Sequence, residues 1–221
     1  MIHCGRSVTN ERYKQREAMS VQFKIAGMFF LLLGLAACGS GAKLPKLPAE
    51  AKVLAFGDSL TFGTGADSAQ SYPSVLQGII GREVINAGVP GETSAEGLAR
   101  LPAVLDEHQP ALLILCHGAN DFLRGLSEQQ AANNIRAMVK LAKDRGIGVV
   151  LIAVPKFGLM FSPPEFYAKI AEEFSIPFDT GTLSRIIRDN SLKSDAVHPN
   201  GSGYRMLAEA VAERLKVAGA I

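Results

Sequence analysis

The sequence is poor in cysteine, in net charge and in long apolar runs. Three cysteines among 221 residues exclude a small disulfide-rich protein. Residues 38–221 carry 18 basic and 19 acidic side chains, and this balance argues against a nucleic-acid-binding protein, which needs a basic face. Apolar residues make up 48% of the chain, which excludes disorder and predicts one globular domain with one core.

Motifs for metal ions and nucleotides are also missing. The chain contains no H-E-x-x-H, no Cys-x-x-Cys pair and no P-loop, so no metal ion and no cofactor are expected. Cys4 precedes a leader-like run, Cys38 follows it, and Cys116 stands alone in an apolar segment. Cys116 is therefore expected to be an inert core residue, and no disulfide is expected in the mature chain.

The N-terminal segment has the features of a signal peptide. Ile25–Ala37 is an apolar run of 13 residues behind Lys24, shorter than the about 20 residues that cross a bilayer but typical of a signal-peptide core. The run ends in Leu-Ala-Ala before Cys38, which resembles the bacterial lipobox. We therefore expect residues 1–37 to be removed, with Met19 as an alternative start, and Cys38 to be lipidated. A plain secreted protein with a chance cysteine is the alternative.

A lipid on Cys38 would anchor the protein to a membrane of the cell envelope. Gly39 follows this cysteine in place of Asp, as in lipoproteins sent on to the outer membrane, so a periplasm-facing lipoprotein of the outer rather than the inner membrane is expected. Gly39–Glu50 contains Gly, Ser and two Pro, which predicts a flexible tether of roughly 20 Å. The folded domain is expected to cover 51–221.

From residue 51 onward, short apolar runs alternate with amphipathic segments. The expected strands are Val53–Phe56, Val84–Asn86, Leu112–Cys116, Val149–Val154 and Ile176–Phe178. The expected helices cover 72–80, 94–107, 127–146, 164–174, 183–190 and 204–215. Ser127 with Gln130 predicts a capping box at the start of one of them. This alternation predicts an α/β fold with a parallel sheet of about five strands, helices on both faces and a ligand site at the carboxyl ends of the strands.

Four polar segments stand at the ends of these elements. They are Gly57-Asp58-Ser59-Leu60-Thr61, Asn86-Ala87-Gly88-Val89-Pro90-Gly91-Glu92-Thr93, His117-Gly118-Ala119-Asn120-Asp121 and Asp195-Ala196-Val197-His198-Pro199-Asn200. Together they resemble the GDSL or SGNH hydrolase family over residues 52–217. The stretch 97–125 is especially similar to its bacterial branch of acyl-CoA thioesterases, lysophospholipases and arylesterases, whose familiar members are soluble rather than anchored. The resemblance implies a three-layer α/β/α flavodoxin-like fold.

Ser59 stands where the first strand turns toward a helix, a placement that exposes its hydroxyl above the sheet. A serine nucleophile needs a base, and the base needs a group that orients it. His198 fits the base, because Pro199 favours an extended backbone there and Asp195 can reach its Nδ1. The resemblance assigns these same roles to Ser59, His198 and Asp195. A helix-capping role is the alternative for Ser59, and the absence of a G-x-S-x-G elbow argues against the α/β-hydrolase fold.

The remaining histidines and Asp58 are expected to be structural. His3 lies in the leader, and His108 is expected at a surface helix end. His117 is expected to make a structural hydrogen bond, with a place in the site as the alternative. Asp58 is expected to brace the loop rather than to take part in the chemistry.

By resemblance, three donors would stabilise the negative charge that develops on the carbonyl oxygen of the substrate. They are the N–H of Ser59, the N–H of Gly91 and the side-chain amide of Asn120. Gly88 is the alternative to Gly91, because both are glycines of the same segment and glycine lets the backbone approach a substrate closely.

Substrate choice is the feature that the sequence predicts least. Leu60, Phe122 and Phe157 flank the polar segments and are expected either to line an acyl groove or to pack under a helix. The leading hypothesis is a monomeric esterase or thioesterase that hydrolyses arylesters, acyl thioesters or lysophospholipids, with water as the final acceptor. A carbohydrate O-acetyl esterase and a catalytically silent binding lipoprotein of the same fold are the alternatives.

Overall fold

A five-stranded parallel sheet forms the centre of the computed structural model, which describes residues 42–156, 158 and 161–221. Its strands are β1 (Val53–Gly57), β2 (Val84–Gly88), β3 (Leu112–Cys116), β4 (Gly148–Ile152) and β5 (Phe178–Asp179). Every residue of β1 and β3 is buried. These central strands are covered on both faces, which explains why their sequences are apolar without alternation.

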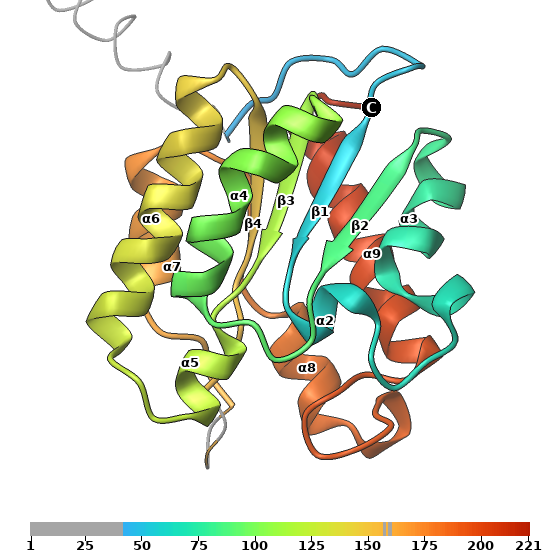
Figure 1. Cartoon of the computed structure of the whole chain (residues 1–221). Coiled ribbons are helices and arrows are strands. Elements are labelled where there is room, and N and C mark those ends of the chain that lie inside the picture. The colour runs from blue at the N-terminus through green and yellow to red at the C-terminus, as the bar shows by residue number, and fades with distance from the viewer. Residues whose placement is uncertain (1–41, 157, 159–160) are drawn as a thin grey trace, which may run out of the picture. The chain divides into compact units, whose positions relative to one another are not determined.

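Helices cover both faces of the sheet (Figure 1). One face carries α4 (Ser94–His108), α6 (Glu128–Asp144) and α7 (Phe166–Glu173), and the other carries α3 (Tyr72–Ile80), α8 (Thr182–Arg188) and α9 (Gly201–Val217). Short helices α2 (Ser59–Phe62) and α5 (Ala119–Leu123) follow β1 and β3, and the 3₁₀ turns η2 (Ser68–Gln70) and η3 (Asn190–Leu192) lie in loops. The predicted three-layer α/β/α fold is confirmed.

The register of the central strands brings three loops to one level. β1 pairs with β2 and β3 in parallel, and Gly57 lies opposite Gly88 on one side and opposite Cys116 on the other. The strand order is β2-β1-β3-β4-β5. In this order β2 is added on one side of β1, and β3, β4 and β5 are added on the other side. The loops that follow β1 and β3 therefore lead to opposite faces of the sheet and leave a crevice between them. The polar segments after β1, β2 and β3 therefore meet at one edge of the sheet.

The predicted capping box at the start of α6 forms only in part. The Ser127 hydroxyl accepts the N–H of Gln130 at 3.3 Å, but the Gln130 amide donates to Asn134 at 3.0 Å instead of reaching back. A complete capping box begins α4, where Thr93 and Glu96 hydrogen-bond each other's main-chain N–H groups. Both arrangements satisfy N–H groups that a helix start leaves open.

The predicted flexible tether is wrong over residues 43–50, which pack on the domain. The N–H of Leu44 donates to the carbonyl of Ala218 at 3.0 Å, and the N–H of Leu47 donates to the carbonyl of Ala220 at 2.8 Å. The Leu47 side chain is 5% exposed and belongs to the core. Figure 1 shows this segment beside the C-terminus, at the end of the sheet opposite α2 and α5. Cys38 and the predicted signal peptide lie outside the described residues.

Candidate active site

Ser59 is the first residue of α2, just beyond the carboxyl end of β1. Asp58 is the N-cap of this helix, and its Oδ1 accepts the N–H of Leu60 at 3.1 Å. Gly57 lets the end of β1 approach β3 closely, because a side chain there would collide with the carbonyl of Cys116. The Ser59 side chain is half-buried, and within the described part of the chain its main-chain N–H has no hydrogen-bond acceptor.

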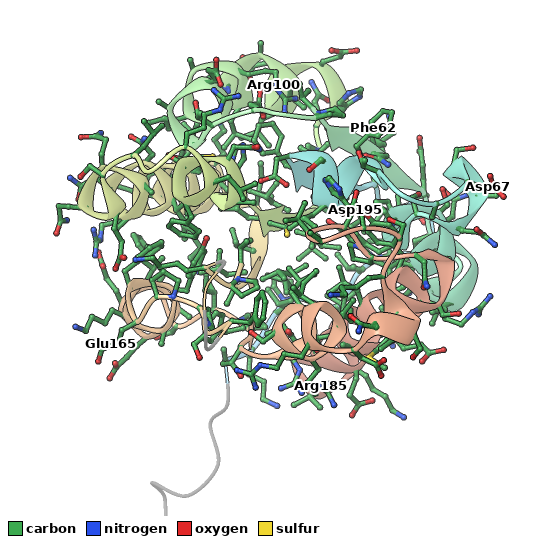
Figure 2. All side chains as sticks on the ribbon, turned by 90° about the horizontal axis from the view of Figure 1, so that it is seen from below. Phe62, Asp67, Arg100, Glu165, Arg185 and Asp195 are labelled. Atoms are coloured by element: carbon green, nitrogen blue, oxygen red, sulfur yellow. The ribbon has the colours of Figure 1, made fainter. Side chains whose placement is uncertain are left out.

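His198 and Asp195 form a hydrogen-bonded chain with Ser59. The Oγ of Ser59 lies 3.0 Å from Nε2 of His198, and Nδ1 of the same ring lies 2.8 Å from Oδ2 of Asp195. The other carboxylate oxygen accepts the N–H groups of Val197 and His198, each at 2.8 Å. The fold thus brings together three residues that the sequence separates by up to 139 positions. Figure 2 views this edge of the sheet from below, with Asp195 labelled.

Main-chain contacts fix the loop that presents His198. Lys193 and Pro199 form an antiparallel bridge, and the N–H of Ser194 donates to the carbonyl of His198 at 3.0 Å. The side chain of Asn200 caps α9 and also donates to the carbonyl of Lys193 at 3.2 Å. The imidazole is therefore held in place by the fold, as a rigid site requires.

Two carboxylates beside Ser59 differ in their electrostatics. Burial opposes ionisation of Asp195, but hydrogen bonds from His198 and from two main-chain N–H groups outweigh it, so the pKa of Asp195 is lowered. Asp58 is fully buried, and there the burial dominates and raises its pKa. Asp195 is therefore the carboxylate that stays ionised beside the imidazole, while Asp58 shapes the turn.

Val89, Pro90, Gly91 and Glu92 form a tight turn after β2. The N–H of Glu92 donates to the carbonyl of Val89 at 3.2 Å, and Gly91 has a φ of 82°. Proline at the second position and a glycine with positive φ at the third are what a type II turn requires. Among the residues described, nothing accepts the N–H of Gly91, which leaves this donor open to a substrate.

The N–H of Gly88, the alternative donor, is already engaged. It donates to Oδ1 of Asn86 at 3.0 Å. Gly88 also lies against the main chain of Phe62, where any side chain would collide. Gly88 therefore serves the packing of β2 against α2, and the structure favours Gly91 over Gly88 as an oxyanion donor.

Asn120 lies in α5, which follows β3. Its Nδ2 donates one hydrogen to the carbonyl of Glu92 at 3.0 Å. The neighbouring Asp121 is buried and accepts the N–H and the hydroxyl of Ser94 at 2.8 and 2.7 Å. These bonds join α5 to the start of α4, so that Asn120 and the turn at Gly91 belong to one framework.

Comparison with known proteins identifies the family. Residues 55–206 match the GDSL-like lipase/acylhydrolase family. The chain belongs to this family. Its fold, with a parallel sheet between two helix layers and Ser59 after the first strand, agrees with that membership.

Relatives in the family are ester-bond hydrolases by name. An arylesterase of Vibrio mimicus is 34% identical over 178 residues, which cover 76% of this chain and 89% of the relative. Thioesterase 1/protease 1/lysophospholipase L1 of Escherichia coli K12 is 29% identical over 172 residues, covering 74% of this chain and 83% of the relative. The crystal structure of the psychrotrophic esterase EstA from Pseudoalteromonas sp., inhibited by monoethylphosphonate, matches with a TM-score of 0.67 at 25% identity, over 76% of this chain and 97% of that one.

A buried charged group behind the turn at Gly91 was not predicted from the sequence. Glu92 is 7% exposed, and its carboxylate accepts two bonds from Arg100, at 2.7 and 2.8 Å, and lies 3.1 Å from Nε2 of His117. Burial opposes its ionisation, but these partners lower the pKa of Glu92 to about 2. The signal in the sequence is a glutamate inside a turn with an arginine in the next helix. His117 is completely buried, which confirms its structural role.

The residues predicted to line the substrate have three different outcomes. Leu60 is 3% exposed and belongs to the core, because α2 turns that side chain inward. Of its two expected roles, packing is therefore the correct one and lining a groove is wrong. Phe122 is half-buried, with its ring 6.4 Å from that of Phe166. Phe157 lies outside the described residues. Exposed apolar side chains at this edge are instead Phe62, Val89 and Leu123.

Cys116 does not take part in the site. It is fully buried, and burial raises the pKa of its thiol well above the ordinary value. Over the described ranges, no group of three or more metal-ligating side chains lies together.

Proposed function

We propose that the protein is a serine esterase/thioesterase that hydrolyses acyl esters through an acyl-enzyme on Ser59. The observation that supports this most directly is the chain of hydrogen bonds from Ser59 through His198 to Asp195. A serine hydroxyl becomes an effective nucleophile when a base takes its proton and a third group orients that base. The three residues have this arrangement.

In the acylation step, Oγ of Ser59 attacks the carbonyl carbon of the substrate while Nε2 of His198 accepts the hydroxyl proton. Asp195 keeps Nδ1 of the ring protonated and stabilises the imidazolium that forms, since its carboxylate stays ionised. The imidazolium then gives its proton to the leaving alcohol or thiol as the C–O or C–S bond breaks. The acyl group remains on Ser59.

Three donors would stabilise the negative charge on the carbonyl oxygen during this attack. The N–H groups of Ser59 and Gly91 are open in the residues described, and the amide of Asn120 has one hydrogen left beyond its bond to Glu92. Fixed donors of this kind act mainly in the transition state, where the charge develops.

Water completes the cycle. His198 accepts a proton from a water molecule as that water attacks the acyl carbon, and the same proton returns to Oγ of Ser59 when the acyl–oxygen bond breaks. The products are the carboxylic acid and the free enzyme. The imidazole of His198 thus carries the proton in both half-reactions.

The substrates we propose are arylesters, acyl thioesters and lysophospholipids. Phe62, Val89 and Leu123 are 53, 40 and 49% exposed. They stand in the segments that follow β1, β2 and β3, so they offer an acyl chain apolar contacts at this end of the sheet. The names of the relatives agree with this substrate range. The test is a hydrolysis profile on p-nitrophenyl esters from acetyl to palmitoyl, with acyl-CoA and lysophospholipid alongside and a Ser59→Ala variant as the blank.

The same profile decides between the alternatives. Turnover that rises with acyl length, or that extends to acyl-CoA and lysophospholipid, supports the proposal. Turnover confined to acetyl esters would favour a carbohydrate O-acetyl esterase, and no turnover above that of Ser59→Ala would favour a silent binding protein.

We also propose that the mature protein is a monomer anchored through a lipid on Cys38, on the periplasmic side of the outer membrane. The lipobox-like residues before Cys38 support this, and among the helices of the described segments none is long and apolar enough to cross a membrane. A lipobox cysteine carries more than one acyl chain, and two chains give stable attachment where one is marginal. Cys38→Ser should remove the lipid-anchored form from the membrane fraction. An unmodified Cys38 in the mass spectrum of membrane-extracted protein would contradict the anchor and leave the hydrolase proposal intact.

A further inference from the structure

Glu92 stands between the two parts of the proposed oxyanion hole. Its main-chain carbonyl accepts the amide of Asn120 at 3.0 Å, and its own N–H closes the turn that presents Gly91. One residue therefore joins both donors that do not belong to Ser59. The inference that follows rests on the proposed function, because it concerns how that hole is held.

Arg100 holds the carboxylate of Glu92 with two parallel bonds. Its Nε and Nη2 lie 2.7 and 2.8 Å from the two carboxylate oxygens, the fork geometry that fixes direction as well as charge. Nη2 also donates to the carbonyl of Ala87 in β2 at 3.0 Å, and the guanidinium stacks 4.2 Å over the ring of Phe56 in β1. The arginine, labelled on α4 in Figure 2, thus ties Glu92 to the central strands.

His117 holds the same carboxylate from the side of β3. Its Nδ1 accepts the N–H of Gly118 at 3.0 Å, which leaves the Nε2–H to donate to Glu92 at 3.1 Å. The carbonyl of His117 accepts the hydroxyl of Tyr167 at 2.6 Å. Gly97 of α4 leaves the space for the ring, since a side chain at this position would collide with Nε2.

Charge explains why the carboxylate needs both partners. A bare negative group next to the oxyanion hole would oppose the charge that forms on the substrate oxygen, and an unpaired buried carboxylate is costly. Arg100 neutralises the charge of Glu92, so the remaining effect of the Glu92 carboxylate is to fix the position of its residue. With its side chain fixed to β1, β2 and β3, Glu92 cannot rotate away from Asn120.

We propose that Glu92, held by Arg100 and His117, is a positioning residue that sets the amide of Asn120 and the turn of Gly91 for oxyanion stabilisation. Glu92 does not touch the substrate. Its effect on the rate passes through Asn120 and Gly91, so it should act on kcat and leave KM nearly unchanged.

The test is a double-mutant cycle on a water-soluble p-nitrophenyl ester. Glu92→Gln should lower kcat by roughly tenfold with KM within about twofold, a size typical of coupled neighbours. In an Asn120→Ala background, the same substitution should lower kcat by less than about threefold, because its main route to the transition state is already lost. Arg100→Lys, which keeps the charge but not the fork, should show the same dependence on Asn120 with a smaller loss, and it replaces Glu92→Gln in the cycle if that variant does not fold.

A matched control separates positioning from loss of stability. Asp179 of β5 is also a buried carboxylate, and it accepts the N–H and the hydroxyl of Thr182 at 3.0 and 2.8 Å. Asp179→Asn should lower Tm and keep kcat. The inference is overturned if the losses from Glu92→Gln and Asn120→Ala multiply, if Glu92→Gln changes KM alone, or if Asp179→Asn lowers kcat as much. If Ser59→Ala itself keeps turnover, the proposed function fails first, so the two failures are distinguishable.

Discussion

The two edges of the sheet are built in different ways. At the carboxyl edge, Ser59, His198 and Asn120 stand on short helices and loops, and polar hydrogen bonds fix them. At the amino edge, residues 43–50 pack apolar side chains on the core and bond through their backbone to 218–220. One edge holds groups in place for chemistry, and the other closes the core. Changes at the first should therefore alter rate with little effect on stability, and changes at the second should do the reverse.

The largest expected effect is at Ser59. Ser59→Ala should lower kcat by on the order of 10⁶-fold and leave Tm within about 2 °C, because the hydroxyl is half-buried and its described side-chain partner is His198. Kinetics on a p-nitrophenyl ester and thermal unfolding measure both quantities. Ser74→Ala removes a serine hydroxyl on α3 that bonds Ser68 and Ser71. It is the control for activity and should keep the kcat of the wild type. Turnover that survives in Ser59→Ala would show that Ser59 is not the nucleophile.

Asn120→Ala should have the next largest effect. Removing one oxyanion donor should lower kcat by about 100- to 1,000-fold with little change in KM, since the donor acts in the transition state. Asn133→Ala, which removes an exposed amide from α6, should change neither value. A loss confined to KM would make Asn120 a residue that positions the substrate.

Truncation tests the amino edge. A chain that starts at Ala51 loses the burial of Leu47 and the backbone bonds of 43–50, so its free energy of unfolding should fall by about 3 kcal/mol and its Tm by roughly 10 °C relative to a chain that starts at Ala42. Its kcat at a temperature where both are folded should be unchanged. Lys46→Ala, at an exposed position of the same segment, should have no effect. Equal Tm values for the two chains would show that this segment does not stabilise the core.

The smallest expected effect is the pH dependence of the stability that Glu92 contributes at the carboxyl edge. The pKa of Glu92 is lowered to about 2 from 4.5, so the folded state binds its proton less readily than the unfolded state. The stability that this carboxylate contributes is present above pH 4.5 and is lost as the pH falls toward 2. The difference in free energy of unfolding between wild type and Glu92→Gln should therefore shrink over this range in denaturant titrations. A difference that stays constant from pH 5 to pH 2.5 would contradict the paired state of Glu92.

Features that are local in sequence could be predicted. The apolar runs predict the strands, and the polar segments after them predict where Ser59, Gly91 and Asn120 stand, because parallel strands end at one edge. Asp195 and His198 are three residues apart, so their pairing needs only one turn of chain. The turn at Gly91 follows from proline and glycine at its two central positions.

Features that depend on packing could not be predicted in the same way. The segment 43–50 looks like a linker because it is rich in Pro and Lys. Its partners are distant in sequence: Val217, which accepts a bond from Lys43, is 174 residues away, and Arg82, which donates to the carbonyls of Leu47 and Pro48, is 35 and 34 residues away. The burial of Leu60 depends on which face of a four-residue helix turns inward. Glu92 meets Arg100 and His117 only once α4 has packed beside β3. The glutamate in the turn and the arginine in the next helix are visible in the sequence, but their contact depends on that packing.

The role of Ser59 is tested by locating the nucleophile chemically. The protein is treated with a fluorophosphonate and analysed by intact mass and peptide mapping, beside Ser59→Ala and His198→Ala. We predict one adduct, on Ser59, that is absent in Ser59→Ala and forms far more slowly in His198→Ala, since the hydroxyl then lacks its base. Labelling of a different residue, or an equal extent of labelling in Ser59→Ala, would contradict the account.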